Sequence, residues 1–155
     1  MEKPSDKPAS AGNGVELGIL RTLLGYHLRR AQIAVFQHFT ETMGEADITP
    51  GQFGVLSVIS GNSGLSQTQL GNALGIDRST VVAVIDRLEG RGLVMRAASP
   101  TDRRSHALKL SEDGARLLRR LEEMVQEHER HIARTLSAEE QKRLIELLDR
   151  VASAE

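Results

Sequence analysis

The chain has 155 residues, of which 39% are hydrophobic and 26% are charged, a composition typical of a soluble globular protein. It contains no cysteine, which excludes disulfides, thiolate metal sites and the sensing of oxidants through a thiol. No run approaches the roughly 18 apolar residues that a membrane helix needs, and the N-terminus has no apolar signal core. We therefore expect a cytoplasmic protein without a membrane partner.

The net charge of −1 is unevenly distributed along the chain. Residues 77–110 carry seven arginines and lysines against four acidic residues, whereas residues 111–155 carry eight against eleven. A local positive patch matters more for binding nucleic acid than the total charge does. The alternative interpretation is a set of solvated side chains without a common role.

The first 14 residues hold prolines, glycines and serines and no large apolar side chain after Met1, which predicts a disordered tail. From residue 15 onward, apolar residues recur at steps of three and four and predict one long helix from Leu17 to about Met43. Further apolar residues outside this stripe indicate that the helix packs on more than one partner. We assign residues 15–48 to dimerisation.

Three short helices are expected next. Thr49 is a predicted N-cap with Pro50 at the first helical position, and that helix ends near Gly61. The following two helices are predicted over Ser66–Leu74 and Arg78–Glu89, with Gly75 permitting the tight turn between them.

A hairpin follows these helices. The sequence pairs Leu93–Arg96 with Ala107–Leu110, closed by a loop over Ser99–Ser105. A supporting helix, a second helix and a cationic hairpin form the arrangement that reads a DNA major groove and its flanking backbone. Residues 49–110 are therefore predicted to form a winged helix-turn-helix DNA-binding domain.

The C-terminal part is predicted to be two helices. Ser111 begins a long amphipathic helix that reaches Leu136, and a capping box at Ser137 begins a last helix that ends near Val151. We assign residues 111–155 to dimerisation. The expected fold is mainly α-helical, with a two-stranded β-wing and a helical dimerisation region from both termini.

The helix over Arg78–Glu89 has two distinct faces. Its inner face carries Val81, Val84, Ile85 and Leu88, which are expected to pack on the core. On the outer face, small hydroxyls suit phosphate contact, short apolar side chains suit a thymine methyl, and arginines reach guanine or phosphate. The candidate DNA contacts on this helix are Arg78, Ser79, Thr80, Val82, Ala83 and Arg87. An ordinary amphipathic helix is the alternative.

The hairpin tip adds Asp102, Arg103 and Arg104 to the candidate DNA contacts. An aspartate beside two arginines can hold one guanidinium extended toward a narrow minor groove. The alternative interpretation is a polar turn with solvated charges.

At these residues the sequence strongly resembles the MarR family of winged-helix transcription regulators. The motifs that carry the resemblance are Leu74-Gly-Ile-Asp-Arg-Ser-Thr-Val81, Asp86-Arg-Leu-Glu-Gly-Arg-Gly-Leu-Val94, Ser99-Pro-Thr-Asp-Arg-Arg104 and Leu110-Ser-Glu-Asp-Gly-Ala115. The resemblance implies a homodimer on a pseudo-palindromic double-stranded DNA operator, most often a repressor that a small ligand releases. It also implies that Asp102 and Arg104 form the wing's Asp-x-Arg pair.

The resemblance suggests an aromatic or other organic acid, or its thioester, as the effector. Such a ligand needs an apolar slot and a histidine or arginine for its polar end. The candidates near the helix junctions are Tyr26, His27, Arg30, His38, Phe39 and Phe53. For each of them, plain packing or a solvated position is the alternative.

Neither a metal site nor a cofactor is predicted. His128 and His131 lie three residues apart on a helix, but zinc needs three or four converging ligands, and His27 and His38 are distant in sequence. No catalytic triad, phosphate loop or carboxylate pair indicates an enzyme. The alternatives to a ligand-released repressor are a ligand-independent or metal-responsive regulator and a winged helix used for protein contacts.

Overall fold

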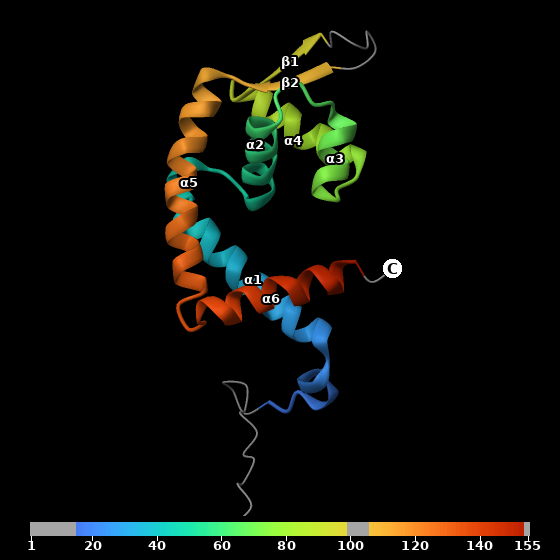
Figure 1. Ribbon diagram of the computed structural model, residues 1–155, viewed down its shortest axis with the longest axis vertical. Helices are drawn as coiled ribbons and strands as arrows, with labels where there is room; N and C mark the ends of the chain where they lie inside the picture. Colours follow the sequence, from blue (N-terminus) through green and yellow to red (C-terminus); the bar gives the residue numbers. More distant parts are fainter. Residues whose placement is uncertain (1–14, 99–105, 154–155) are drawn as a thin grey trace, which may run out of the picture. The chain divides into compact units, whose positions relative to one another are not determined.

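The computed structural model describes residues 15–98 and 106–153 of the chain. Contacts within it divide the chain into two units, with the boundary between Val35 and Phe36, and each is described by itself. In the described residues the elements are η1 (Gly18–Thr22), α1 (Leu24–Thr42), η2 (Gly44–Ala46), α2 (Pro50–Gly61), α3 (Gln67–Leu74), α4 (Arg78–Gly90), β1 (Val94–Ala98), β2 (His106–Leu110), α5 (Glu112–Ile132) and α6 (Ala138–Ala152) (Figure 1). This mainly helical order with a two-stranded wing confirms the predicted fold class.

The single helix predicted from Leu17 is wrong at its start. Gly18 has a φ of +54°, which a continuous α-helix does not contain, and it begins a 3-10 helix that ends at Thr22. Leu23 is then extended, with a ψ of 120°, so α1 begins only at Leu24. Leucines at steps of three fit a 3-10 helix as well as an α-helix, so the apolar stripe did not reveal the break.

The predicted helix starts are confirmed by their capping geometry. Thr49, Ser66 and Ser137 each form a reciprocal capping box with the residue three positions later. Gly75 has a φ of +64° and caps α3 in the left-handed conformation that the tight turn requires. Local hydrogen bonds thus define where these helices begin.

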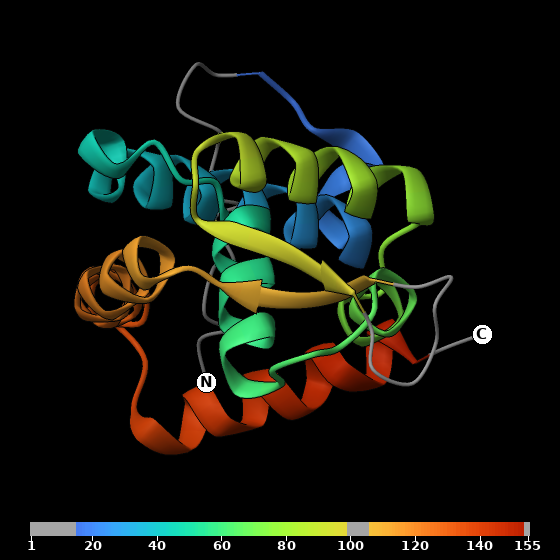
Figure 2. The ribbon, with the colours of Figure 1, turned by 90° about the horizontal axis from the view of Figure 1, so that it is seen from above.

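The wing differs from its predicted register by one residue. Val94 pairs with Leu110 and Ala98 with His106 in an antiparallel ladder (Figure 2). Leu93 lies outside the ladder because its N–H donates to the Leu88 carbonyl and its own carbonyl accepts from Ser111 N–H. Its backbone groups therefore join α4 to the start of α5.

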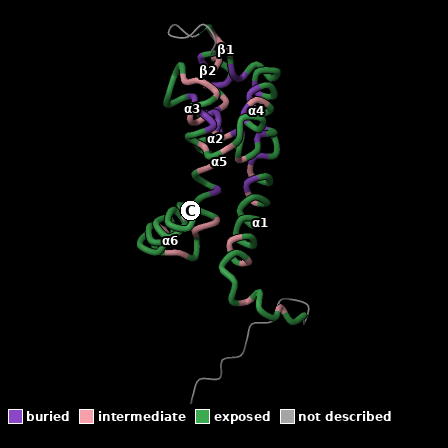
Figure 3. The backbone as a smooth tube through the Cα atoms, turned by 90° about the vertical axis from the view of Figure 1, so that its right-hand side faces the viewer, coloured by how far each residue is buried: buried purple, intermediate pink, exposed green. Residues whose placement is uncertain are grey.

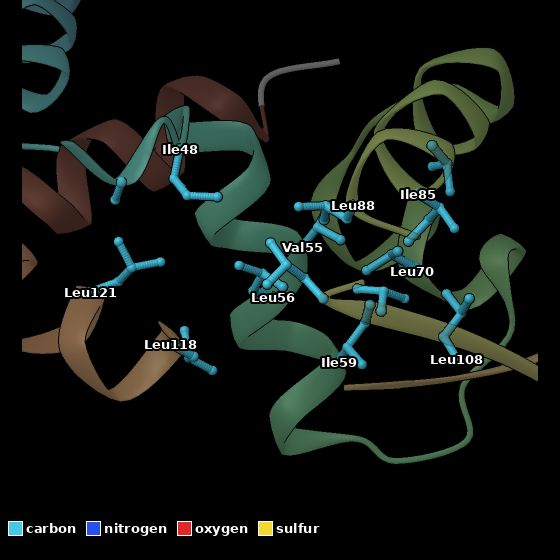
Figure 4. Close-up of a cluster of buried hydrophobic side chains, with 14 of the residues drawn as sticks. Ile48, Val55, Leu56, Ile59, Leu70, Ile85, Leu88, Leu108, Leu118 and Leu121 are labelled. Atoms are coloured by element: carbon cyan, nitrogen blue, oxygen red, sulfur yellow. The ribbon is translucent and has the colours of Figure 1, made fainter. Parts of the chain in front are cut away.

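The core of the second unit is built around α2. Val55, Leu56 and Ile59 are fully buried there, and Figure 4 shows them facing side chains from the neighbouring elements. Burying a side chain of this size contributes about 1.5–3 kcal/mol. The partners labelled in the figure are Leu70 of α3, Ile85 and Leu88 of α4, Leu108 of β2, and Leu118 and Leu121 of α5.

Large apolar side chains remain exposed outside this core. The residues of α6 are exposed along almost its whole length (Figure 3), and five of its large apolar residues are at least 40% exposed. They are Leu144, Ile145, Leu147, Leu148 and Val151. Among the described residues, no helix has both the length and the apolar character needed to cross a membrane.

Substitution of Gly114 is expected to destabilise the protein. A Cβ at this position would overlap the backbone carbonyl of Leu93, which cannot move without disturbing both α4 and the wing. We expect Gly114→Ala to lower the free energy of unfolding by about 1–3 kcal/mol, measured by urea denaturation at fixed protein concentration.

Gly90→Ala is the matched control for this prediction. Gly90 is the last residue of α4, and a Cβ there meets nothing within 4 Å. The control should unfold at the same urea concentration as the wild type or a higher one. Equal stability of the two variants would contradict the close approach at Gly114.

Candidate DNA-binding interface

One face of α4 is fixed by burial and the other is free to meet a ligand. Val81, Ile85 and Leu88 are fully buried, and Val84 is partly buried, as the sequence predicted. On the opposite face the side chains are exposed except Val82, which is partly buried; a shallow concavity there is lined by Arg78, Ser79, Val82, Ala83 and Asp86. Its floor is short and apolar, and its rim carries charge.

Hydroxyl groups and a carboxylate form a compact network at the N-terminus of α4. Asp77 accepts from Ser79 Oγ, from Thr80 Oγ1 at 2.6 Å and from Thr80 N–H at 3.0 Å. The hydrogen bonds from the Ser79 and then the Thr80 side chain hold the pKa of Asp77 well below its ordinary value. The two hydroxyl hydrogens are therefore committed to Asp77, and a phosphate would meet an ionised carboxylate here.

Arg96 on β1 binds two acidic residues of α4. It forms an ion pair with Asp86 at 2.5 Å and another with Glu89. The amide oxygen of Gln67 on α3 accepts from Arg96 Nε and Nη2 at 3.0 and 3.1 Å when that oxygen faces the guanidinium. Burial opposes the charge of Arg96, but its hydrogen bond and Coulomb attraction to Asp86 and Glu89 outweigh burial and raise its pKa. Arg96 therefore joins the first wing strand to α3 and α4.

Two basic residues counted in the positive segment have structural partners. Arg91 donates to the carbonyl oxygens of Asp47 at 2.6 Å and Ala46 at 2.9 Å, and Arg96 is neutralised by α4. No pattern in the sequence predicts the contact with Asp47, which is 44 residues away. Among the described residues, Arg78 and Arg87 form no ion pair. The predicted contacts Asp102, Arg103 and Arg104 lie outside the described residues.

The first three effector candidates lie in the unit that ends at Val35. Tyr26 and His27 are in edge-to-face contact, and the Arg30 guanidinium lies 5.8 Å from the Tyr26 ring centre. His27 Nε2 is 2.9 Å from the Arg21 carbonyl oxygen. Arg21 itself was not among the predicted candidates. Its Nε and Nη2 are inaccessible to solvent and have no hydrogen-bond partner among the described residues, although Nη2 lies 3.8 Å from a Glu16 oxygen.

The other three candidates lie in the second unit. Phe39 is buried, and its ring centre is 6.3 Å from that of Phe53. His38 Nδ1 lies 2.8 Å from His128 Nδ1, and its ring stacks on that of His131. The structure thus brings together histidines that are 90 residues apart, an approach that sequence spacing did not predict. Even so, the described residues contain no group of three side chains arranged to hold a metal ion.

Comparisons with known proteins place the chain in a family. The MarR family model matches residues 46–105. A protein of Thauera aromatica, assigned to transcriptional regulation of the hcr operon, is 42% identical over 154 residues, covering 97% of this chain and 92% of the relative. The chain belongs to the MarR family. This membership confirms the predicted transcriptional regulator and excludes the enzyme class.

Solved MarR-type structures match nearly the whole described fold. The repressor CouR bound to a 23-mer DNA duplex is 40% identical with a TM-score of 0.84, covering 89% of this chain and 98% of that chain. CouR bound to p-coumaroyl-CoA is 37% identical with the same TM-score, covering 91% and 99%. PcaV from Streptomyces coelicolor with its natural ligand is 35% identical with a TM-score of 0.82, covering 87% and 95%.

Replacing Arg96 in this MarR-family protein is expected to loosen the wing from α4. Arg96→Met should lower the free energy of unfolding by about 1 kcal/mol, because two carboxylates lose a shared partner. Arg96→Lys should recover little of this lost stability, since one ammonium group cannot replace a planar guanidinium that donates to several acceptors. Urea denaturation of both variants measures this difference.

Arg116→Met is the control for charge removal alone. Arg116 is 61% exposed and pairs with Asp113 and Glu112 within the same helix. Its loss should leave the urea midpoint nearly unchanged. If Arg96→Lys were as stable as the wild type, the simultaneous contacts of the Arg96 guanidinium with Asp86 and Glu89 would not contribute to stability.

Proposed function

We propose that this MarR-family protein is a homodimeric repressor that binds a pseudo-palindromic operator and releases it on binding an aromatic acid or its thioester. The observation that carries the proposal is the likeness to CouR, a repressor solved on a DNA duplex, over 98% of that chain. The charge and burial pattern of α4 supports the same conclusion independently. A protein-interaction module would not need exposed arginines at both ends of this helix.

In this proposal α4 lies in the major groove with its concave face toward the bases. Arg78 and Arg87 are exposed and supply contacts to guanine or phosphate. Val82 and Ala83 provide a short apolar surface for a thymine methyl. Ser79 and Thr80 act mainly by closing the Asp77 cap, so they shape the end of the helix that meets the backbone.

The unpaired apolar surface of α6 supports dimerisation. Five large apolar side chains at least 40% exposed on one 15-residue helix are costly in water and typical of an interface. A single winged helix reads only a few base pairs, whereas two copies about 34 Å apart read both half-sites on one side of the duplex. We propose a second copy of this chain as the partner of α6.

The N-terminal unit supports an anionic effector. The buried Arg21 nitrogens have no hydrogen-bond partner among the described residues, and an unsatisfied buried donor favours a ligand that accepts hydrogen bonds. His27 and Arg30 lie on the adjoining turns of α1 beside the Tyr26 ring. This set fits the carboxylate or thioester end of an aromatic ligand. CouR binds p-coumaroyl-CoA.

The proposed function is tested by selecting genomic fragments with the purified protein at near-physiological salt. We expect enrichment of one two-fold symmetric site of about 16–20 base pairs, as two half-sites one helical turn apart require. Binding without sequence preference that is lost steeply with salt would leave a backbone binder only. Recovery of no DNA would favour the protein-interaction module instead.

On the selected operator, Arg87→Ala should weaken binding by about 1–3 kcal/mol and lower the steepness of the salt dependence. Lys142→Ala is the control, because Lys142 is an exposed cation on α6, away from the recognition lobe in sequence. Titrations at several salt concentrations measure both effects. Unchanged affinity of Arg87→Ala would remove this arginine from the interface.

Effector release is tested by titrating the protein–operator complex with p-coumaroyl-CoA, free p-coumarate and coenzyme A alone. We expect an aromatic acid or its thioester, and not coenzyme A alone, to release the DNA. Arg21→Gln should raise the concentration needed about tenfold, because a charge-assisted hydrogen bond contributes about 1.5–3 kcal/mol. Arg29→Gln, an exposed cation of α1 with no assigned role, is the matched control. Equal responses of the two variants would contradict the role of Arg21.

A further inference from the structure

Three imidazoles gather where the last turns of α1 meet α5. His38 Nδ1 lies 2.8 Å from His128 Nδ1, and the His38 ring stacks on His131 with ring centres 3.9 Å apart and planes 16° apart. His128 is only 1% exposed, and the Phe39 ring meets it edge-on at 5.4 Å. None of these side chains is among the proposed DNA contacts, and neither His128 nor His131 is among the effector candidates.

The nitrogen–nitrogen contact constrains the protonation of the pair. One ring must donate its Nδ1 hydrogen and the other must accept through an unprotonated Nδ1. If one of the two rings is protonated, the Nδ1 of the other still accepts the hydrogen bond. If both rings are protonated, neither Nδ1 can accept, and two positive charges are in contact. His131, stacked on His38, adds a third repulsive partner once it is charged. The contact therefore disfavours the simultaneous protonation of both rings.

The surrounding charges do not cancel this effect. Glu41 on α1 and Glu127 and Glu129 on α5 favour protonation, but Glu127 also pairs with Arg130 at 2.5 Å. Arg134, just after α5, opposes the charge of His131. The sequence of α2, whose Phe53 packs near Phe39, contains no titratable residue.

Both α5 histidines are harder to protonate in the folded chain than in the unfolded one. Burial first, and then the charges of His38 and His131, lower the pKa of His128 below 6.5. His131 is exposed, but desolvation by the groups packed on it, and then the charges of His38 and Arg134, lower its pKa in the same direction. A lowered folded pKa means that this stability is present in full above pH 6.5 and is lost as the pH falls through the folded values.

We propose that His38, His128 and His131 form a proton-sensitive junction that holds the end of α1 on α5 while it is neutral and releases it on acidification. The cluster binds protons rather than a metal. Parallel stacked rings cannot both direct an in-plane nitrogen at one ion, and the described residues contain no converging set of three ligands. If the proposed function holds, operator affinity falls in the same pH range, because α5 begins against the recognition lobe at Ser111.

The junction is tested on the full chain without DNA. Histidine resonances of the ¹³C-labelled protein are titrated by NMR, and the Tm is measured at pH 7.5 and 5.5. We expect His128 and His131 to titrate below their ordinary pKa of 6.5 in the wild type and to move toward it in His38→Asn. Asparagine keeps a hydrogen-bonding group near the position of Nδ1 but does not titrate. The fall in Tm on acidification should be roughly halved in this variant.

His106→Gln is the matched control for the Tm comparison, because His106 is exposed at the start of β2 and lies outside the cluster. Its Tm should fall with pH as in the wild type.

Ordinary pKa values for His128 and His131 in the wild type would overturn the proposal, even if His38→Asn failed to fold. An equal fall in Tm for His38→Asn and His106→Gln would also overturn it, as would a rise in Tm with added zinc that His38→Asn abolishes. Operator binding is titrated separately at both pH values. Absence of DNA binding in these titrations would contradict the proposed function but not the proposal for the histidine junction.

Discussion

The burial of three side chains of α4 against the α2 core is the interaction on which the recognition surface depends. Val81, Ile85 and Leu88 are all fully buried. Each contributes about 1.5–3 kcal/mol, so turning the helix by one residue would expose several of these groups at once. The rotation of α4 is therefore fixed before any DNA is present. The α4 residues proposed to contact a base or phosphate point outward because this inner face is buried.

The neighbouring contacts hold both ends of that helix through backbone atoms. A Cβ at Gly71 would lie 3.0 Å from the Ile76 carbonyl oxygen and 3.1 Å from a Val81 methyl, so a side chain there would require α3 or the turn to shift by a few tenths of an ångström. At the other end, Leu93 joins α4 to α5 through its N–H and carbonyl groups. The recognition lobe is thus closed by local geometry, whereas α6 has a largely exposed apolar surface. The two regions therefore differ physically, since the recognition lobe buries its apolar side chains within its own core and α6 leaves five of them at least 40% exposed.

The parts of this structure that could be predicted from sequence are those fixed by local chemistry. The caps at Thr49, Ser66 and Ser137 depend on residues three positions apart, and the faces of α4 depend on helical period, so a linear pattern contains them. The break before α1 was missed because leucines spaced by three suit either helix type. The contacts of Arg91 with Asp47 and of His38 with His128 join residues 44 and 90 positions apart. No sequence spacing predicts such pairs, because the packing of the core determines which distant residues come into contact.

The acidic residues of the recognition region are held by local partners within a chain of net charge −1. Asp77 stays ionised while hydroxyl and amide donors at the helix start hold its carboxylate, and Asp86 and Glu89 share Arg96. The Arg96 side chain is only 19% exposed and is paired with carboxylates, so it contributes little to the electrostatic potential at the protein surface. Among the described residues of the region 77–110, the arginines that form no ion pair and no backbone contact are Arg78 and Arg87, near the two ends of α4. Such a helix surface is expected to draw its affinity from phosphate contacts of these arginines and its selectivity from the short apolar groups between them, and one helix of this length contacts only a few base pairs.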